Sequence, residues 1–206
     1  MTRIKICGIT RVEDGLACAR LGADAIGLVF YAPSPRAVSI PQAQAITATL
    51  PPFVTTVALF VNPERAEVEA VLRGVRPDLL QFHGHETADF CGQFGLRYLK
   101  ALPVKAGSDL LQSAAAYPDA AGLLLDTPTE AFGGCGERFD WSLIPAEIAA
   151  RCVLAGGLNA ANVATAIRQV RPWAVDVSSG VETDKKGIKD ADKIAAFIKE
   201  VRNADL

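Results

Sequence analysis

Two stretches decide the fold: Cys152-Val153-Leu154-Ala155-Gly156-Gly157-Leu158-Asn159 and Ala174-Val175-Asp176-Val177-Ser178-Ser179-Gly180-Val181-Glu182. Each is a short apolar run that ends in small residues, a pattern typical of a strand that leads into a helix. Glycine lets a backbone approach a ligand closely, and the unpaired N–H groups at a helix start attract anions. Two such turns on neighbouring strands can hold one phosphate, as happens after strands seven and eight of (βα)8 barrels. The alternative is a pair of ordinary strand–helix turns.

The same pattern recurs along the whole chain. Strands that alternate with helices at a regular period predict a parallel sheet, and eight units favour its closure. We therefore expect an α/β protein with a single-domain (βα)8 TIM barrel over residues 1–206, and a doubly wound open sheet is the alternative. Apolar runs of strand length begin near residues 3, 24, 53, 78, 97, 121, 152 and 174, about 24 residues apart on average. Helical patterns lie between them, over 12–21, 41–50, 63–73, 160–170 and 190–201, and in weaker form over 86–94, 109–116 and 141–149.

Composition narrows the classes of protein to which the chain can belong. Half of the 206 residues are hydrophobic, and the net charge of −2 gives no indication of a nucleic acid or an anionic membrane as partner. No uncharged apolar run approaches the ~20 residues needed to span a bilayer. The five cysteines are odd in number and scattered, and the first residues form a strand pattern rather than a signal peptide. We therefore expect a cytoplasmic protein without a disulfide framework.

Function in such a barrel lies at the C-terminal ends of its strands, which makes two residues candidates for chemistry. Cys7 closes the first strand, where its sulfur would be exposed at the mouth and could act as a nucleophile or base. Asp126 ends the sixth strand after four apolar or small residues, and a carboxylate in apolar surroundings suits general-acid work. Facing each other across the mouth, they would form an acid–base pair. The alternatives are a buried apolar cysteine and a helix-capping aspartate.

An arginine and a histidine are candidates for binding. Arg36 follows the proline-bounded segment 33–35, and a guanidinium held on so rigid a loop suits bidentate capture of a carboxylate. A solvent-exposed arginine is the alternative. His83 and His85 are the only histidines of the sequence, and no third ligand occurs at a regular zinc spacing, so we expect no metal site. Gly84 between them would let His83 face the pocket.

A set of motifs that occur together and in order resembles the phosphoribosylanthranilate isomerase family of tryptophan biosynthesis over nearly the whole chain. The resemblance implies a (βα)8 barrel that performs an Amadori rearrangement without cofactor or metal. The substrate would be N-(5-phosphoribosyl)anthranilate and the product 1-(2-carboxyphenylamino)-1-deoxyribulose 5-phosphate. The motifs are Lys5-Ile6-Cys7-Gly8-Ile9-Thr10, Ser34-Pro35-Arg36, Gln81-Phe82-His83-Gly84, Leu125-Asp126-Thr127, Gly156-Gly157-Leu158 and Val175-Asp176-Val177-Ser178-Ser179-Gly180-Val181-Glu182.

The resemblance also implies roles for single residues. Cys7 would be the general base and Asp126 the general acid, and Arg36 would hold the anthranilate carboxylate. His83 and Asp176 would contact the substrate. The implied partner is one small phosphosugar–anthranilate molecule, with no nucleic acid or membrane, and the chain would be a monomer or homodimer. Phosphate binding would fall to Gly156, Gly157, Ser179 and Gly180.

The chain departs from the family pattern at one place, and two other functions stay open. In Gly133-Gly134-Cys135-Gly136 a cysteine stands where the family usually has threonine, in a loop that could cover the pocket. Another phosphosugar barrel, such as the related histidine-pathway isomerase or a pentose-phosphate epimerase, is one alternative. The former resembles a two-aspartate enzyme, whereas this chain has a cysteine after its first strand. A non-catalytic phosphate sensor is the other, but it has no need for both Cys7 and Asp126.

Strand alternation predicts a buried ion pair beneath the candidate site. Lys5 shares a face with Cys7, so it points into the barrel if Ile4 and Ile6 face the helices. Asp176 points inward from the eighth strand for the same reason, and barrel closure makes the two strands neighbours. Because an unpaired buried charge is costly, we expect Lys5 and Asp176 to pair. The alternative is that Lys5 reaches water at the mouth while Asp176 binds backbone or a substrate hydroxyl.

Overall fold

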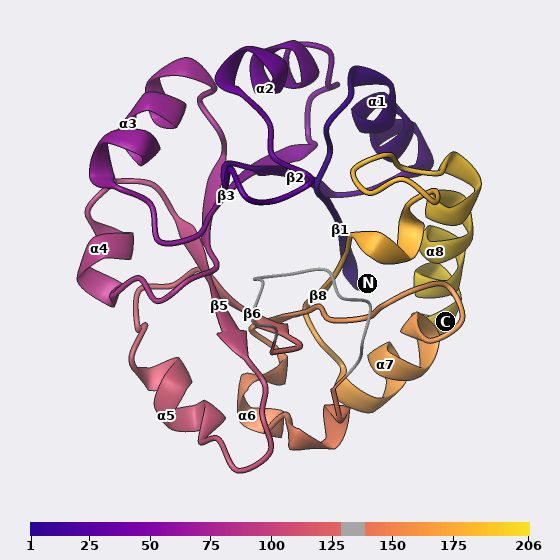
Figure 1. The fold of residues 1–206 in the computed structure, drawn as a ribbon. Coiled ribbons are helices and arrows are strands. Elements are labelled where there is room, and N and C mark those ends of the chain that lie inside the picture. Colours follow the sequence, from indigo (N-terminus) through magenta and orange to yellow (C-terminus); the bar gives the residue numbers. More distant parts are fainter. Residues whose placement is uncertain (129–138) are drawn as a thin grey trace.

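The computed structural model describes residues 1–128 and 139–206. Eight parallel strands follow one another in chain order around a closed barrel, and β1 pairs with β8 (Figure 1). The predicted (βα)8 barrel is therefore confirmed, and the open-sheet alternative is wrong. The strands are β1 (Arg3–Cys7), β2 (Ala25–Val29), β3 (Thr55–Phe60), β4 (Leu79–Phe82), β5 (Tyr98–Pro103), β6 (Gly122–Asp126), β7 (Cys152–Leu154) and β8 (Ala174–Val177).

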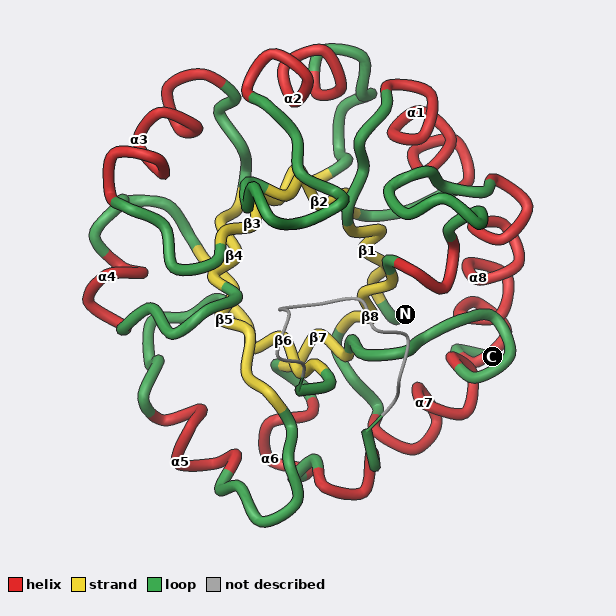
Figure 2. The backbone as a smooth tube through the Cα atoms, viewed as in Figure 1, coloured by secondary structure: helices red, strands yellow, loops and turns green. Residues whose placement is uncertain are grey.

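The helices form a ring outside the strands (Figure 2). None of the described helices is both long and apolar enough to cross a membrane. They are α1 (Val12–Leu21), α2 (Ile40–Thr47), α3 (Arg65–Gly74), α4 (Ala88–Gly92), α5 (Leu110–Ala115), α6 (Ala146–Ala149), α7 (Val163–Val170) and α8 (Ala191–Ala204), with the short 3-10 helices η1 (Trp141–Leu143) and η2 (Ser179–Val181).

The helix predicted over 141–149 is broken into η1 and α6. Pro145 separates the two, because the residue before a proline is driven out of the helical region, and Ile144 is extended here. Elsewhere the predicted ends differ from the observed ends by a few residues. Asp109 caps α5 by accepting a hydrogen bond from the Gln112 N–H at 2.9 Å.

Alternation along the strands divides the apolar residues between two sides of the barrel wall. Ile4 and Ile6 belong, as predicted, to the large core between strands and helices. A smaller cluster that includes Leu124 and Val153 fills the barrel interior. At the mouth, Cys7 lies in a third cluster, with Val29, Leu59 and Val61. The inward side chains nearest the C-terminal ends of the strands therefore line the mouth of the barrel.

Candidate active site

A pocket opens at the C-terminal ends of the strands, where the barrel rule places function. Eight of the nine predicted site residues line it, although they come from strands and loops spread along the whole chain. Gly180 is the one that lies outside the pocket wall. The eight are Cys7, Arg36, His83, Asp126, Gly156, Gly157, Asp176 and Ser179.

The Cys7 thiol lies at the floor of this pocket. The prediction of an exposed sulfur is wrong, since only 7% of the residue is accessible among Val29, Leu59 and Val61. Burial raises the pKa of the thiol, and the nearby Lys5 ammonium opposes that rise without cancelling it. Desolvation therefore disfavours the thiolate form of Cys7, and the ammonium of Lys5 below it favours that form.

The predicted pair of Lys5 and Asp176 is present. The two residues are direct partners in the β1–β8 register, and Lys5 Nζ lies 2.9 Å from Asp176 Oδ2, with side chains 5% and 8% exposed. Burial alone would lower the pKa of Lys5, but Asp176 and Cys7 raise it, so the ammonium stays charged. Asp176 Oδ1 has no hydrogen-bond partner in the described part of the chain. This oxygen lies in a pocket-lining residue and can accept a bond from a ligand.

Asp126 and His83 lie side by side at the ends of β6 and β4. Asp126 Oδ1 accepts a hydrogen bond from the Thr127 N–H at 2.7 Å, and Oδ2 lies 3.2 Å from His83 Nε2. The carboxylate therefore has polar neighbours, and the prediction of apolar surroundings is wrong at its outer end. His83 faces the pocket as expected.

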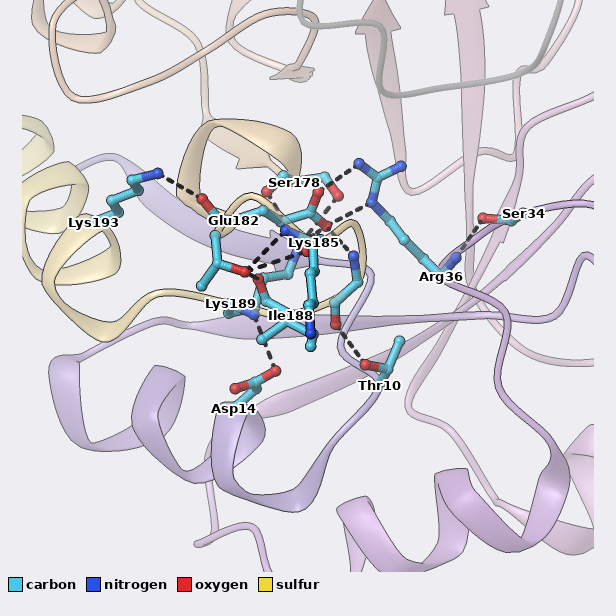
Figure 3. Close-up of polar contacts among 12 residues, drawn as sticks. Thr10, Asp14, Ser34, Arg36, Ser178, Glu182, Lys185, Ile188, Lys189 and Lys193 are labelled. Atoms are coloured by element: carbon cyan, nitrogen blue, oxygen red, sulfur yellow. Dashed lines mark hydrogen bonds and ion pairs between the residues drawn. The ribbon is translucent and has the colours of Figure 1, made fainter.

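Arg36 is buried, with 6% of the residue exposed, so the solvent-exposed alternative is wrong. Its Nε and Nη2 donate to the two carboxylate oxygens of Glu182 at 2.7 and 2.8 Å (Figure 3). This fork is occupied from within the chain, and neither bond uses Nη1. A Cβ at Gly8, where φ is +76°, would lie 2.5 Å from Arg36 Cδ, so glycine there makes room for the arginine stem.

Glu182 joins Arg36 to a second buried cation that the sequence did not suggest. Lys189 Nζ donates to Glu182 Oε1 at 3.0 Å and to the carbonyl and hydroxyl oxygens of Ser178 at 3.1 and 3.3 Å (Figure 3). Although burial acts to raise it, the bonds from Arg36 and Lys189 lower the pKa of Glu182 to about 2. The carboxylate is therefore ionised and ties the Arg36 loop to the turn after β8.

The two predicted phosphate turns lie against each other. A side chain at Gly180 would collide with the carbonyl of Leu158, so only glycine allows the second turn to approach the first this closely. The sequence pattern predicts that both turns open a helix. Only the second does so directly, because η2 begins at Ser179 whereas α7 starts six residues after Gly157. The buried Lys189 ammonium lies behind the second turn, where it adds positive charge.

Two further expectations concern the loop after β6 and metal binding. The departure at Cys135 lies outside the described residues. Among the described residues, no group of three or more histidine, cysteine, aspartate or glutamate side chains is arranged to hold a metal ion. No sequence pattern predicts a role for Glu182 or Lys189, and Glu182 is marked only by its place at the end of the last motif.

Comparisons with known proteins agree on one family. The family model described as N-(5'phosphoribosyl)anthranilate (PRA) isomerase matches residues 4–200. An N-(5'-phosphoribosyl)anthranilate isomerase of Pseudomonas fluorescens is 59% identical over 98% of this chain and 96% of its own length. A relative from Pseudomonas aeruginosa, also 59% identical, covers 98% and 95% respectively.

Solved structures agree with this assignment. The phosphoribosyl anthranilate isomerase of Thermotoga maritima superposes with a TM-score of 0.90 at 44% identity, over 98% of this chain and all of that one. Another isomerase structure, with a TM-score of 0.87 and 42% identity over 98% of this chain and all of that one, holds reduced 1-(o-carboxyphenylamino)-1-deoxyribulose 5-phosphate. A third, also from Thermotoga maritima, is of monomers generated from a dimeric isomerase, with a TM-score of 0.87, 40% identity and the same coverage.

A double-mutant cycle tests the pair at the closure of the barrel. Lys5→Met and Asp176→Asn should each destabilise the fold by about 3–5 kcal/mol, because each leaves one buried group without its partner. The double variant should lose much less than the sum, as measured by urea unfolding. Additive losses would show that the two groups are not coupled.

Alkylation of Cys7 by iodoacetamide tests its protonation. Because the thiolate reacts and burial raises the pKa of the thiol above its ordinary 9.0, the rate should climb with pH to a midpoint above that value. Lys5→Met should move the midpoint higher still, since the lysine opposes the rise.

A Cys135→Ser background leaves three other thiols, whose burial raises their pKa to about 12: Cys18, Cys91 and Cys152. A midpoint below 9.0 for Cys7 would mean that the lysine outweighs burial.

Proposed function

Because the chain belongs to the N-(5'-phosphoribosyl)anthranilate isomerase family, we propose that Cys7 is the general base and Asp126 the general acid of its reaction. That reaction is the Amadori rearrangement of N-(5-phosphoribosyl)anthranilate to 1-(2-carboxyphenylamino)-1-deoxyribulose 5-phosphate, an aldose–ketose isomerisation of tryptophan biosynthesis. The proposal is supported most directly by one observation: both side chains line the same pocket as residues of the two glycine turns.

The chemistry needs an acid and a base on different sides of the sugar. Ring opening breaks the furanose C–O bond, and Asp126 supplies the proton that the departing ring oxygen takes up. Cys7 then removes the proton from the second sugar carbon. A proton is added at the first carbon, and the hydroxyl of the second carbon loses its proton as it becomes the ketone, which balances the proton that Asp126 supplied. The two groups come from β6 and β1, strands that are not neighbours in the barrel. Each can therefore reach its own face of the sugar.

The remaining residues hold the two ends of the substrate. The turns that contain Gly156, Gly157, Ser179 and Gly180 receive the phosphate, with Lys189 adding positive charge from behind. Arg36 presents Nη1 to the anthranilate carboxylate while Glu182 fixes its other edge. Between these anchors, His83 and the unpaired Oδ1 of Asp176 contact the sugar, so that much of the barrier falls through positioning.

We also propose the setting in which the chain works. Residues 1–206 act as one catalytic domain, without a cofactor, on a small-molecule substrate rather than a nucleic acid, in keeping with the net charge of −2. A cytoplasmic location fits the four described cysteines, which are free thiols. The chain is a monomer or, like the dimeric relative, a homodimer, and sedimentation velocity distinguishes the two.

Catalysis is tested by loss of the substrate's anthranilate fluorescence. Purified protein should abolish the signal, and Cys7→Ser and Asp126→Asn should each lower turnover at least ~100-fold with the fold intact by circular dichroism. Cys91→Ala and Asp119→Asn remove the same chemical groups outside the pocket and should retain activity. A variant within tenfold of wild type would remove that residue from its role, and no fluorescence loss at micromolar wild-type enzyme would refute the isomerase assignment.

The role of Arg36 is tested by steady-state kinetics. Arg36→Met should raise KM well above any fall in kcat, because a carboxylate clamp acts on a part of the substrate remote from the bond changes. Inhibition by inorganic phosphate should persist, since the glycine turns and Lys189 remain. If kcat collapsed while KM held, Arg36 would belong with the chemistry instead.

A further inference from the structure

Gln81 is a buried polar residue to which the proposed reaction gives no role. On β4, Gln81 and His83 are two residues apart and so point to the same side, into the barrel. Gln81 is 0% exposed to solvent yet belongs to the wall of the pocket. Burying an amide is costly unless its polar atoms are hydrogen-bonded. Gln81 Oε1 has no hydrogen-bond partner among the described residues, so the contact that its Nε2 makes is the informative one.

The amide begins a line of polar contacts that ends at Asp126. Gln81 Nε2 lies 3.0 Å from His83 Nδ1, and His83 Nε2 lies 3.2 Å from Asp126 Oδ2. The other oxygen of Asp126 is held by the Thr127 N–H at 2.7 Å. One nitrogen of the imidazole therefore faces the amide, and the other lies near the carboxylate.

The amide of Gln81 selects one arrangement of donors and acceptors along this line. Its NH₂ group can only donate, so the imidazole nitrogen that it faces, Nδ1, presents a lone pair. A neutral imidazole carries one N–H and one lone pair, so its proton is then on Nε2, the nitrogen nearer to Asp126 Oδ2. A carboxyl group keeps an oxygen that can accept in either protonation state. The opposite orientation of the amide would set its carbonyl oxygen against the Nδ1 lone pair.

We propose that Gln81 is a positioning residue that fixes His83 as the Nε2–H tautomer directed at Asp126. The proposal rests on the assignment of Asp126 as the general acid. An imidazole with a lone pair at Nε2 would compete for the proton that Asp126 must give to the ring oxygen. The tautomer fixed by Gln81 instead donates to the carboxylate that remains after proton transfer.

Nitrogen NMR of the imidazole tests the tautomer directly in the wild-type chain. The sequence has two histidines, so His85→Asn identifies the His83 signals. At neutral pH, Nε2 should give the shift of a protonated nitrogen and Nδ1 that of an unprotonated one. An Nδ1–H tautomer or an imidazolium in the wild type overturns the proposal, and this measurement needs no variant at Gln81.

Two variants test the link to catalysis. Gln81→Met keeps the volume but removes the donor, so the Nδ1–H tautomer should become populated and kcat should fall about tenfold with little change in KM. Gln81→Glu supplies an acceptor, which should place a proton on Nδ1. Unchanged histidine shifts and kcat in a folded Gln81→Met variant would overturn the proposal.

A wrong role for Gln81 can be distinguished from a wrong role for Asp126. If Asp126→Asn kept its activity, the proposed acid would be wrong, and Gln81 would have no acid to protect even with the expected tautomer. If Asp126→Asn were inactive while the wild-type histidine carried its proton on Nδ1, the role of Gln81 alone would be refuted.

Discussion

Closure of eight parallel strands into a narrow barrel is the constraint on which the site depends. Every second side chain of each strand must point into a space that the other seven strands enclose. At the seam between β1 and β8 this brings Lys5 and Asp176 together in register, 2.9 Å apart and away from water. Neither group could remain there alone, because a buried unpaired charge is strongly destabilising. Each group thus makes the burial of the other tolerable, and the pair places a positive charge beneath Cys7.

The same constraint explains how a chain of net charge −2 builds a site for an anionic substrate. Three buried cations, Lys5, Arg36 and Lys189, share two carboxylates, Asp176 and Glu182. The carboxylates make the burial of the cations tolerable and leave one positive charge in excess beside the phosphate turns. Figure 3 shows Glu182 between Arg36 and Lys189, and one of its oxygens accepts hydrogen bonds from both cations.

Local patterns predicted the fold, the glycine turns and one contact between distant residues. Lys5 and Asp176 are 171 positions apart, but alternation turns both side chains into the barrel and closure makes their strands neighbours, so their pairing could be foreseen. The bond between Arg36 and Glu182 joins residues 146 positions apart, and no local pattern marks such a partner. The burial of Cys7 and the polar contacts of Asp126 likewise arise from neighbours on other strands, which periodicity does not specify.

Two strands of the barrel repeat one arrangement, in which a polar residue lies one inward position below a side chain of the pocket and acts on it. On β1, Lys5 lies one inward position before Cys7 and opposes the rise that burial causes in the pKa of the thiol. On β4, Gln81 lies one inward position before His83 and contacts the imidazole nitrogen that faces away from Asp126. A charge suits the first case, because an ammonium favours the thiolate form of the proposed base. A neutral amide suits the second, because it can select the proposed tautomer of the imidazole without adding a charge. The proposed chemistry therefore depends on the layer below the mouth as well as on the layer that lines the pocket.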